Sequence, residues 1–74
     1  MTFTYDKQLG YRIKTLREKQ GLSQAQLAAK LQTSGCDLTR SGLAKIEVGQ
    51  RHLYSYEIKA FKIVLNVRYE DLFV

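Results

Sequence analysis

A helix stop followed directly by a helix start is the feature that most constrains how this chain folds. Gly21 lies where a residue in the left-handed conformation ends a helix. Ser23 and Gln26, three residues apart, then form a Ser-x-x-Gln capping box that begins the next helix. Because the two signals are almost adjacent, the sequence predicts two α-helices joined by a tight turn.

Periodic apolar residues predict the helices on both sides of this turn. Before it, apolar residues recur at positions i, i+4 and i+7, which predicts an amphipathic helix over residues 6–20. Thr4 or Asp6 is the expected N-cap of this helix, and Ser23 is the expected start of the second. The inward-facing residues are Leu9, Ile13 and Leu16 in the first helix and Leu27, Ala28 and Leu31 in the second.

A polar break at residues 33–37 separates the second helix from a short third one. Thr39 is the expected N-cap of this third helix, which is predicted from residue 40 to about residue 48, with Gly49 at its end. Leu43 and Ile46 stand three residues apart and are expected to face the core.

The last third of the chain predicts one more full helix and a final helical turn. Ser55 is the expected N-cap of the fourth helix, which ends at Asn66, a residue that tolerates the left-handed conformation. The final turn covers residues 69–73. The residues expected to face the core are Ile58, Phe61, Val64 and Leu65 in the helix and Leu72 and Phe73 in the turn.

Length and composition agree with a single all-α domain over residues 1–74. A chain of 74 residues has room for one modest core, and its 45% apolar and 26% charged residues are typical of a soluble globular protein. It contains no proline and five glycines, and its longer segments are rich in helix-forming residues. The sequence therefore predicts a compact five-helix bundle.

The charge of the chain lies in its first two thirds. Residues 1–51 carry nine lysines and arginines against four acids, whereas residues 52–74 carry three against three. This distribution favours one face that binds a polyanion and a neutral part that is free for packing or self-association.

Several classes of protein are excluded by what the sequence lacks. Cys36 and His52 are the only cysteine and histidine, so neither a disulfide framework nor a four-ligand zinc site is expected. Cys36 is interpreted as a small turn residue and His52 as part of a linker. We expect no cofactor and no small-molecule ligand, and no catalysis, because no nucleophile–base pair or clustered carboxylates are present. No apolar stretch is long enough for a membrane span or a secretory signal, so a cytoplasmic location is expected.

Four segments of the chain follow one another in the order of a known family. They are Ile13-Lys14-Thr15-Leu16-Arg17-Glu18, Gly21-Leu22-Ser23-Gln24-Ala25-Gln26-Leu27-Ala28, Leu43-Ala44-Lys45-Ile46-Glu47-Val48-Gly49-Gln50-Arg51 and Leu65-Asn66-Val67 before Glu70-Asp71-Leu72-Phe73. Together they resemble the XRE family, the Cro and phage-repressor type of helix-turn-helix. The resemblance covers about residues 9–73 and implies the lambda-repressor-like fold and sequence-specific binding of double-stranded DNA. It also implies a regulator of transcription, encoded by a bacterium or phage and associated with the nucleoid when bound.

The chain departs from the family pattern between the second and third helices. The segment from Gln32 to Asp37 is about five residues longer than the usual tight turn. Either the second helix extends to Ser34, with Gly35 in the left-handed conformation, or the extra residues form a loop before the third helix. Val48 also stands where the family commonly has Asn, and the proline often found after Arg51 is missing.

The resemblance implies that the third helix reads DNA in the major groove. Arg40, Ser41 and Lys45 match base-facing positions, and Gly42 is a contact too small to specify much. Arg40 is the leading candidate, because a guanidinium can donate two hydrogen bonds to guanine; the alternative is that it only neutralises a phosphate. Contacts to the DNA backbone are expected from Gln24, Thr39, Gln50 and Arg51.

A second implied feature is an ion pair that ties the first helix to the third. Arg17 and Glu47 match this pair, and a bidentate arginine–carboxylate contact would fix the angle between the helices.

Self-association is expected through the neutral, aromatic-rich end of the chain. A homodimer would place two reading helices about one DNA turn apart, and Tyr69, Phe73 and Val74 are the candidate contacts. Two other functions stay open at this point. One is an antitoxin of the same fold that binds a protein toxin as well as DNA, and the other is a protein-interaction module without DNA binding.

Overall fold

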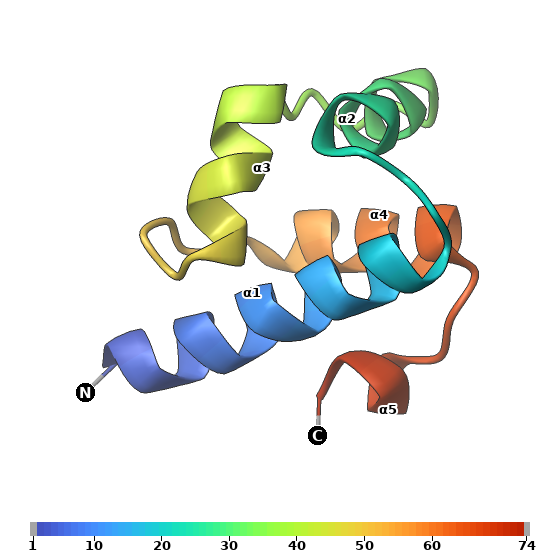
Figure 1. Cartoon of the computed structure of the whole chain (residues 1–74). Helices are drawn as coiled ribbons and strands as arrows, with labels where there is room; N and C mark the ends of the chain where they lie inside the picture. The colour runs from blue at the N-terminus through green and yellow to red at the C-terminus, as the bar shows by residue number, and fades with distance from the viewer. Residues whose placement is uncertain (1, 74) are drawn as a thin grey trace.

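Five α-helices are packed together in the computed structural model, which describes residues 2–73 and the side chains of residues 5–73. α1 contacts α3, α4 and α5, while α2 contacts α3 and α4 (Figure 1). The all-α five-helix fold is therefore confirmed. The helices are α1 (Thr2–Lys19), α2 (Gln24–Thr33), α3 (Arg40–Glu47), α4 (Ser55–Leu65) and α5 (Tyr69–Leu72).

A cluster of buried apolar side chains holds the five helices together, and every helix contributes to it. The inward faces predicted for α2 and α3 are fully confirmed, since all their members are buried. Among the residues that the structure describes, no helix combines the length and apolar character needed to cross a membrane. The best-buried large side chains are Ile13, Leu27, Leu31, Leu43, Ile46, Phe61, Leu65 and Leu72.

Four of the helices end in the same hydrogen-bonded arrangement. In each, a residue with positive φ follows the last turn, and the next N–H donates back to a carbonyl of that turn. Glycine or asparagine stands at these places because other residues pay a steric cost in the left-handed conformation. The left-handed residues are Gly21, Gly35, Gly49 and Asn66, with φ of 73°, 96°, 78° and 56°.

The lengthened segment between α2 and α3 extends α2, which is the first of the two alternatives. α2 continues to Thr33, Gly35 adopts the left-handed conformation, and the Cys36 N–H donates to the Leu31 carbonyl at 2.9 Å. Cys36 is then buried in the core, with 5% of its surface exposed, rather than serving only as a turn residue. Burial raises the pKa of its thiol, which disfavours the reactive thiolate.

The predicted starts of two helices are wrong. α1 begins at Thr2, so neither Thr4 nor Asp6 is its cap, and the Asp6 carboxylate instead lies 3.4 Å from His52 Nδ1. α4 is capped at Tyr54 rather than Ser55, because the Glu57 carboxylate accepts a hydrogen bond from the Tyr54 N–H at 3.0 Å. At α4 the change comes from a side chain that reaches back to the start of its own helix, whereas α1 simply begins earlier than predicted.

Phe73 is also not a core residue. Its side chain is 39% exposed, and its ring stacks on Tyr5 of α1 with the centroids 6.3 Å apart. Leu72 alone of the predicted pair is buried.

Candidate nucleic-acid interface

The starts of α2 and α3 are fixed by side-chain caps. The Ser23 hydroxyl accepts a hydrogen bond from the Gln26 N–H at 3.1 Å, while the Gln26 side chain accepts one from the Ser23 N–H at 2.8 Å. The Thr39 hydroxyl accepts from the Gly42 N–H at 3.0 Å. Both predicted caps are confirmed, and they leave other N–H groups of each first turn without a partner inside the helix.

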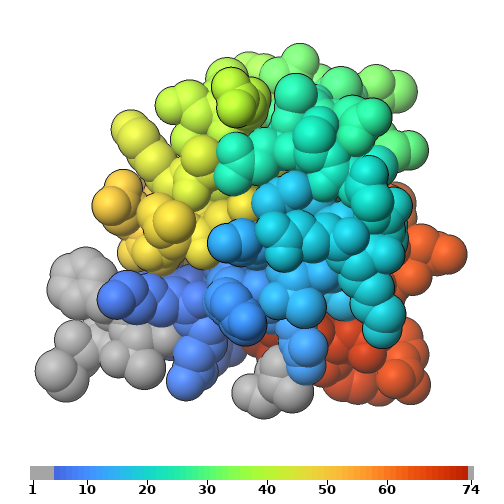
Figure 2. Space-filling view, in the orientation of Figure 1, coloured from blue at the N-terminus to red at the C-terminus, as the bar shows by residue number. Residues whose placement is uncertain are grey.

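These two helix starts meet in one shallow depression of the surface. In Figure 2, α3 and the start of α2 form the upper part of the visible face. The depression brings together residues that were predicted separately from two segments of the sequence. Its lining is Gln24 from α2 and Thr39, Arg40, Ser41 and Ala44 from the start of α3.

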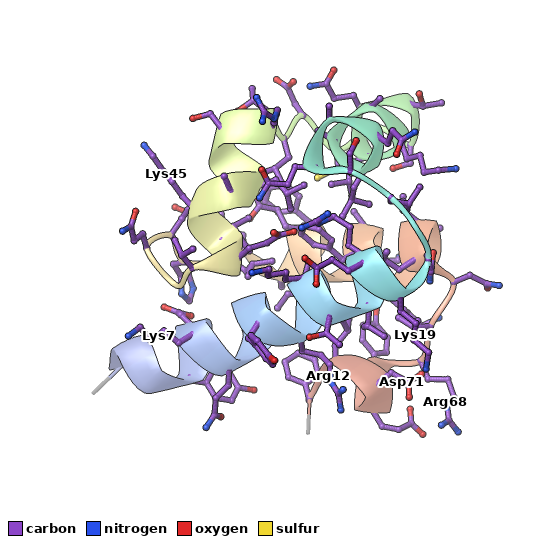
Figure 3. The ribbon with its side chains drawn as sticks, viewed as in Figure 1. Lys7, Arg12, Lys19, Lys45, Arg68 and Asp71 are labelled. Atoms are coloured by element: carbon purple, nitrogen blue, oxygen red, sulfur yellow. The ribbon has the colours of Figure 1, made fainter. Side chains whose placement is uncertain are left out.

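The outer face of α3 carries the side chains predicted to reach base edges. Arg40, Ser41 and Lys45 are exposed, while Gly42 is half-buried beside the Thr39 side chain. Figure 3 shows the Lys45 side chain pointing away from the domain at its outer edge. Among the described residues, neither Arg40 nor Lys45 is held in an ion pair. Both cations are therefore available to a polyanion that approaches α3.

The predicted tie between α1 and α3 is present as a bidentate ion pair. Arg17 Nε lies 2.7 Å from Glu47 Oε2, and Arg17 Nη2 lies 3.0 Å from Glu47 Oε1. Both residues are buried, and the hydrogen bonds that Arg17 donates to Glu47 raise the pKa of Arg17. A third donor of the guanidinium, Nη1, binds the Leu22 carbonyl at 2.7 Å. The guanidinium thus connects α1, the turn before α2 and the end of α3.

Gln24 adds the start of α2 to this connection. Its Nε2 donates to Glu47 Oε1 at 3.0 Å, so Glu47 accepts hydrogen bonds from two helices at once. A buried carboxylate with three hydrogen bonds has few alternative positions, because each lost bond would leave a charge or donor unsatisfied. The angle of α3 relative to α1 and α2 is therefore fixed at its C-terminal end.

Arg51, a predicted contact to the DNA backbone, forms a bidentate ion pair within the protein. Its Nη1 and Nη2 donate to the two oxygens of Glu57 at 2.9 and 2.8 Å, and Glu57 has only 3% of its side chain exposed. The hydrogen bonds from Arg51 lower the pKa of Glu57, although burial acts in the opposite direction. Gln50, next to it, is exposed and donates its N–H to the Lys45 carbonyl at 2.8 Å.

Glu57 and Gly10 are two residues of this region that the sequence analysis missed. Glu57 stands three residues after Tyr54, a spacing that is a recognisable signal for a carboxylate reaching back to a helix start. Gly10 lies inside α1 so close to α3 that a Cβ added to it would meet the backbone of Ile46 and Glu47. A glycine inside a helical pattern signals a close approach only in general terms and does not identify the partner.

Exposed aromatic rings gather where α5 lies against α1. Tyr5 and Tyr11 of α1 and Phe73 line a groove whose floor includes Leu72. Arg12 also lines this groove, and its buried Nε has no hydrogen-bond partner among the residues that are described. Tyr69 is exposed but lies outside the groove, where Lys62 Nζ is 5.3 Å from its ring centroid. Val74, the third predicted dimer contact, lies outside the described residues.

Comparison with known proteins agrees with this geometry. The helix-turn-helix family matches residues 13–72 of the chain. A similar solved structure is that of the restriction-modification controller protein C.AhdI from Aeromonas hydrophila, with 30% sequence identity and a TM-score of 0.84 over 96% of each chain. None of the curated proteins matches the chain.

Proposed function

We propose, from the premise that the chain belongs to the XRE-type helix-turn-helix family of DNA-binding transcription regulators, that it reads a specific duplex sequence through the major groove. One observation carries this proposal: the starts of α2 and α3 meet in a single depression with exposed polar and cationic side chains. A family of DNA-binding regulators is also the reason to regard the chain as non-enzymatic.

The side chains at the start of α3 suit the edges of bases. The major groove of B-DNA admits one α-helix, and the residues of its first turns come closest to the bases. Arg40 supplies the two donors that match O6 and N7 of guanine. Ser41 has a short side chain and Lys45 a long one, and both supply donors on the exposed face of α3. Gly42 lets the helix approach closely, and we propose that specificity comes from the other three.

Backbone contacts would position the helix in the groove. The unpartnered N–H groups at the starts of α2 and α3 favour phosphate, and Gln24 and Thr39 stand beside them. Gln50 and Arg51 stay proposed contacts just beyond α3. A phosphate would share the Arg51 guanidinium with Glu57, so we expect Arg51 to contribute less than an unpaired arginine would.

The kind of regulator is proposed from the likeness to a controller protein. Because the likeness to C.AhdI extends over 96% of the chain, we propose a controller role in transcription for this chain as well. The neutral C-terminal part is then free for self-association rather than for a second activity.

A homodimer is the second part of the proposal. One small DNA-binding module buries about 600–1,000 Å² of protein surface on DNA, which is little for selecting one site in a genome. The groove between α1 and α5 presents three exposed rings, Tyr5, Tyr11 and Phe73, and exposed apolar clusters of this kind mark interaction sites. We propose that Phe73 and the two tyrosines of α1 contact a second copy through this groove, and that Val74 and Tyr69 contribute to the same interface.

Selection of bound sequences from a pool of random duplexes tests the DNA-binding proposal. We expect a recovered site with two related half-sites about 34 Å apart between centres, because a two-fold dimer presents two α3 helices. The variant Arg40→Ala should lose preference at one base position of each half-site, at a cost of about 1–3 kcal/mol. Lys59→Ala, which changes an exposed cation on α4, should select the same site as the wild type.

Sedimentation of the protein with the recovered duplex tests the dimer. We expect two protomers on each site, and we expect Phe73→Ala to weaken this assembly. Tyr56→Ala is the control, because Tyr56 is also an exposed aromatic residue but does not line the groove. One protomer on a site without symmetry would show that the dimer proposal is wrong.

A further inference from the structure

The end of α3 lies directly against the start of α1. A Cβ added to Gly49 would overlap the side chain of Lys7 and come within 2.9 Å of its Cα. The aliphatic part of Lys7 therefore rests on the backbone of the turn that ends α3. Figure 2 shows the two segments adjoining on one face of the molecule.

A second glycine makes this contact possible. The backbone of α1 at Gly10 lies against the backbone of α3 at Ile46, where an added Cβ would be 3.0 Å from the carbonyl carbon and would overlap the oxygen. Because two glycines remove the side chains that would separate the elements, the first turns of α1 are brought to the edge of α3.

The cation of Lys7 lies on the same outer edge as that of Lys45. Figure 3 shows both side chains at this edge, one from α1 and one from α3. Lys7 is exposed, and none of the described carboxylates forms an ion pair with it. Its neighbour in sequence, Asp6, is directed to His52 at 3.4 Å.

The end of α3 favours a neighbouring cation when a phosphate approaches it. The C-terminal end of a helix carries a partial negative charge, which repels phosphate. When α3 lies in the major groove, its C-terminal end and the following turn face a wall of that groove, and the wall is the DNA backbone. Glu47 is neutralised by Arg17, and Arg51 is engaged by Glu57, so an additional cation is needed beside Gly49.

We infer that Lys7 is a phosphate contact, and that the DNA-binding surface continues from α3 across the Gly49 turn onto α1. This inference rests on the proposed DNA binding. It adds a residue from α1, a helix for which the sequence predicts no contact with DNA. The ligand is the sugar–phosphate backbone of duplex DNA. The contact carries no sequence information, since every base sequence presents the same phosphates.

The variant Lys7→Gln isolates the charge. Glutamine keeps the β and γ carbons that lie against Gly49 and replaces the charged end of the side chain with a shorter, neutral amide. Lys7→Arg keeps the charge, and Lys19→Gln removes an exposed cation from the other end of α1, away from Lys7 and Lys45 in Figure 3. Circular dichroism and thermal unfolding of each variant establish that the fold is retained.

Binding is measured by fluorescence anisotropy at several salt concentrations, with a duplex of random sequence and with the duplex recovered by selection. For Lys7→Gln we expect the slope of log K against log salt to flatten by about 0.9. At about 0.1 M salt we expect up to about eightfold weaker binding to both duplexes. Lys7→Arg and Lys19→Gln should keep the wild-type slope.

The outcomes separate this inference from the proposed function. If the wild type shows steep salt dependence and Lys7→Gln shows the same slope and affinity, the role of Lys7 is overturned while DNA binding stands. If Lys7→Gln weakens only the selected duplex, Lys7 reads bases and the phosphate assignment is wrong. If the wild type binds neither duplex, the proposed function fails and the inference fails with it.

Discussion

The contact between Gly10 and α3 gives a sharp prediction about stability. A methyl group at position 10 would overlap the Ile46 carbonyl oxygen and lie 3.2 Å from the Glu47 Cα. All of these atoms belong to backbone, so no flexible side chain can move aside. Since carbon–oxygen contacts settle at about 3.3 Å, Gly10→Ala must push α1 and α3 apart by about 1 Å.

The cost of this movement can be set against the gain from alanine. Overpacking of a well-packed interior typically costs about 1–3 kcal/mol. Moving the helices apart also strains the hydrogen bonds of 2.7 and 3.0 Å between Arg17 and Glu47. Alanine is worth up to about 1 kcal/mol over glycine inside a helix. We therefore expect Gly10→Ala to lower the free energy of unfolding by about 1–3 kcal/mol, out of a total of about 4–11 kcal/mol for a domain of this length.

Gly42 is the matched control for this substitution. It is also helical, but an added Cβ would meet its nearest neighbour, the Thr39 hydroxyl, at an ordinary distance of 3.4 Å. Gly42→Ala should leave stability unchanged or raise it by up to about 1 kcal/mol. Urea unfolding followed by circular dichroism measures both variants. A Gly10→Ala protein as stable as the wild type would refute the reasoning, because helix propensity alone would then decide the outcome.

Three further predictions follow from the buried polar groups. Arg17→Met and Glu47→Gln should each destabilise the fold by about 3–5 kcal/mol, since each leaves a buried partner uncompensated, and a double-mutant cycle without coupling would reject the pair. Because the pKa of Glu57 is lowered in the fold, its carboxylate stabilises the fold above the unfolded pKa of about 4.3, and this stability is lost as the pH falls through the folded pKa. The free energy of unfolding of Glu57→Gln, measured as the pH is lowered, should therefore fall less than that of the wild type. An equal fall in both proteins would argue against the Arg51 contact. The Cys36 thiol should react with a disulfide reagent far more slowly in the folded than in the unfolded protein, and equal rates would contradict its burial.

The sequence was sufficient for the features that depend on local signals. Ser23 with Gln26, Thr39, and the left-handed residues Gly21 and Asn66 each act within one turn of their own helix, and all were predicted. The extension of α2 was one of two alternatives left open. The choice between them depends on burial of Cys36 in the core, which no local pattern reports.

The remaining features depend on contacts between distant segments. Pairing of Arg51 with Glu57, stacking of Phe73 on Tyr5, and the approach of Gly10 to Ile46 each join different helices or a helix and a turn. Such contacts follow from how the helices pack, and one sequence does not specify them. The pairing of Arg17 with Glu47 was an exception only because it was implied by the family resemblance.

The ratio of affinities for the selected duplex and for a shuffled duplex of the same composition tests the central claim most directly. Both are measured at one fixed salt concentration, because the charge-driven part of binding is then common to the two. If the start of α3 reads base edges, the wild type should bind the selected duplex at least about a thousandfold more tightly, and Arg40→Ala should reduce this ratio by about five- to 150-fold. A wild-type ratio close to one would contradict the account, because the protein would then bind DNA by charge alone.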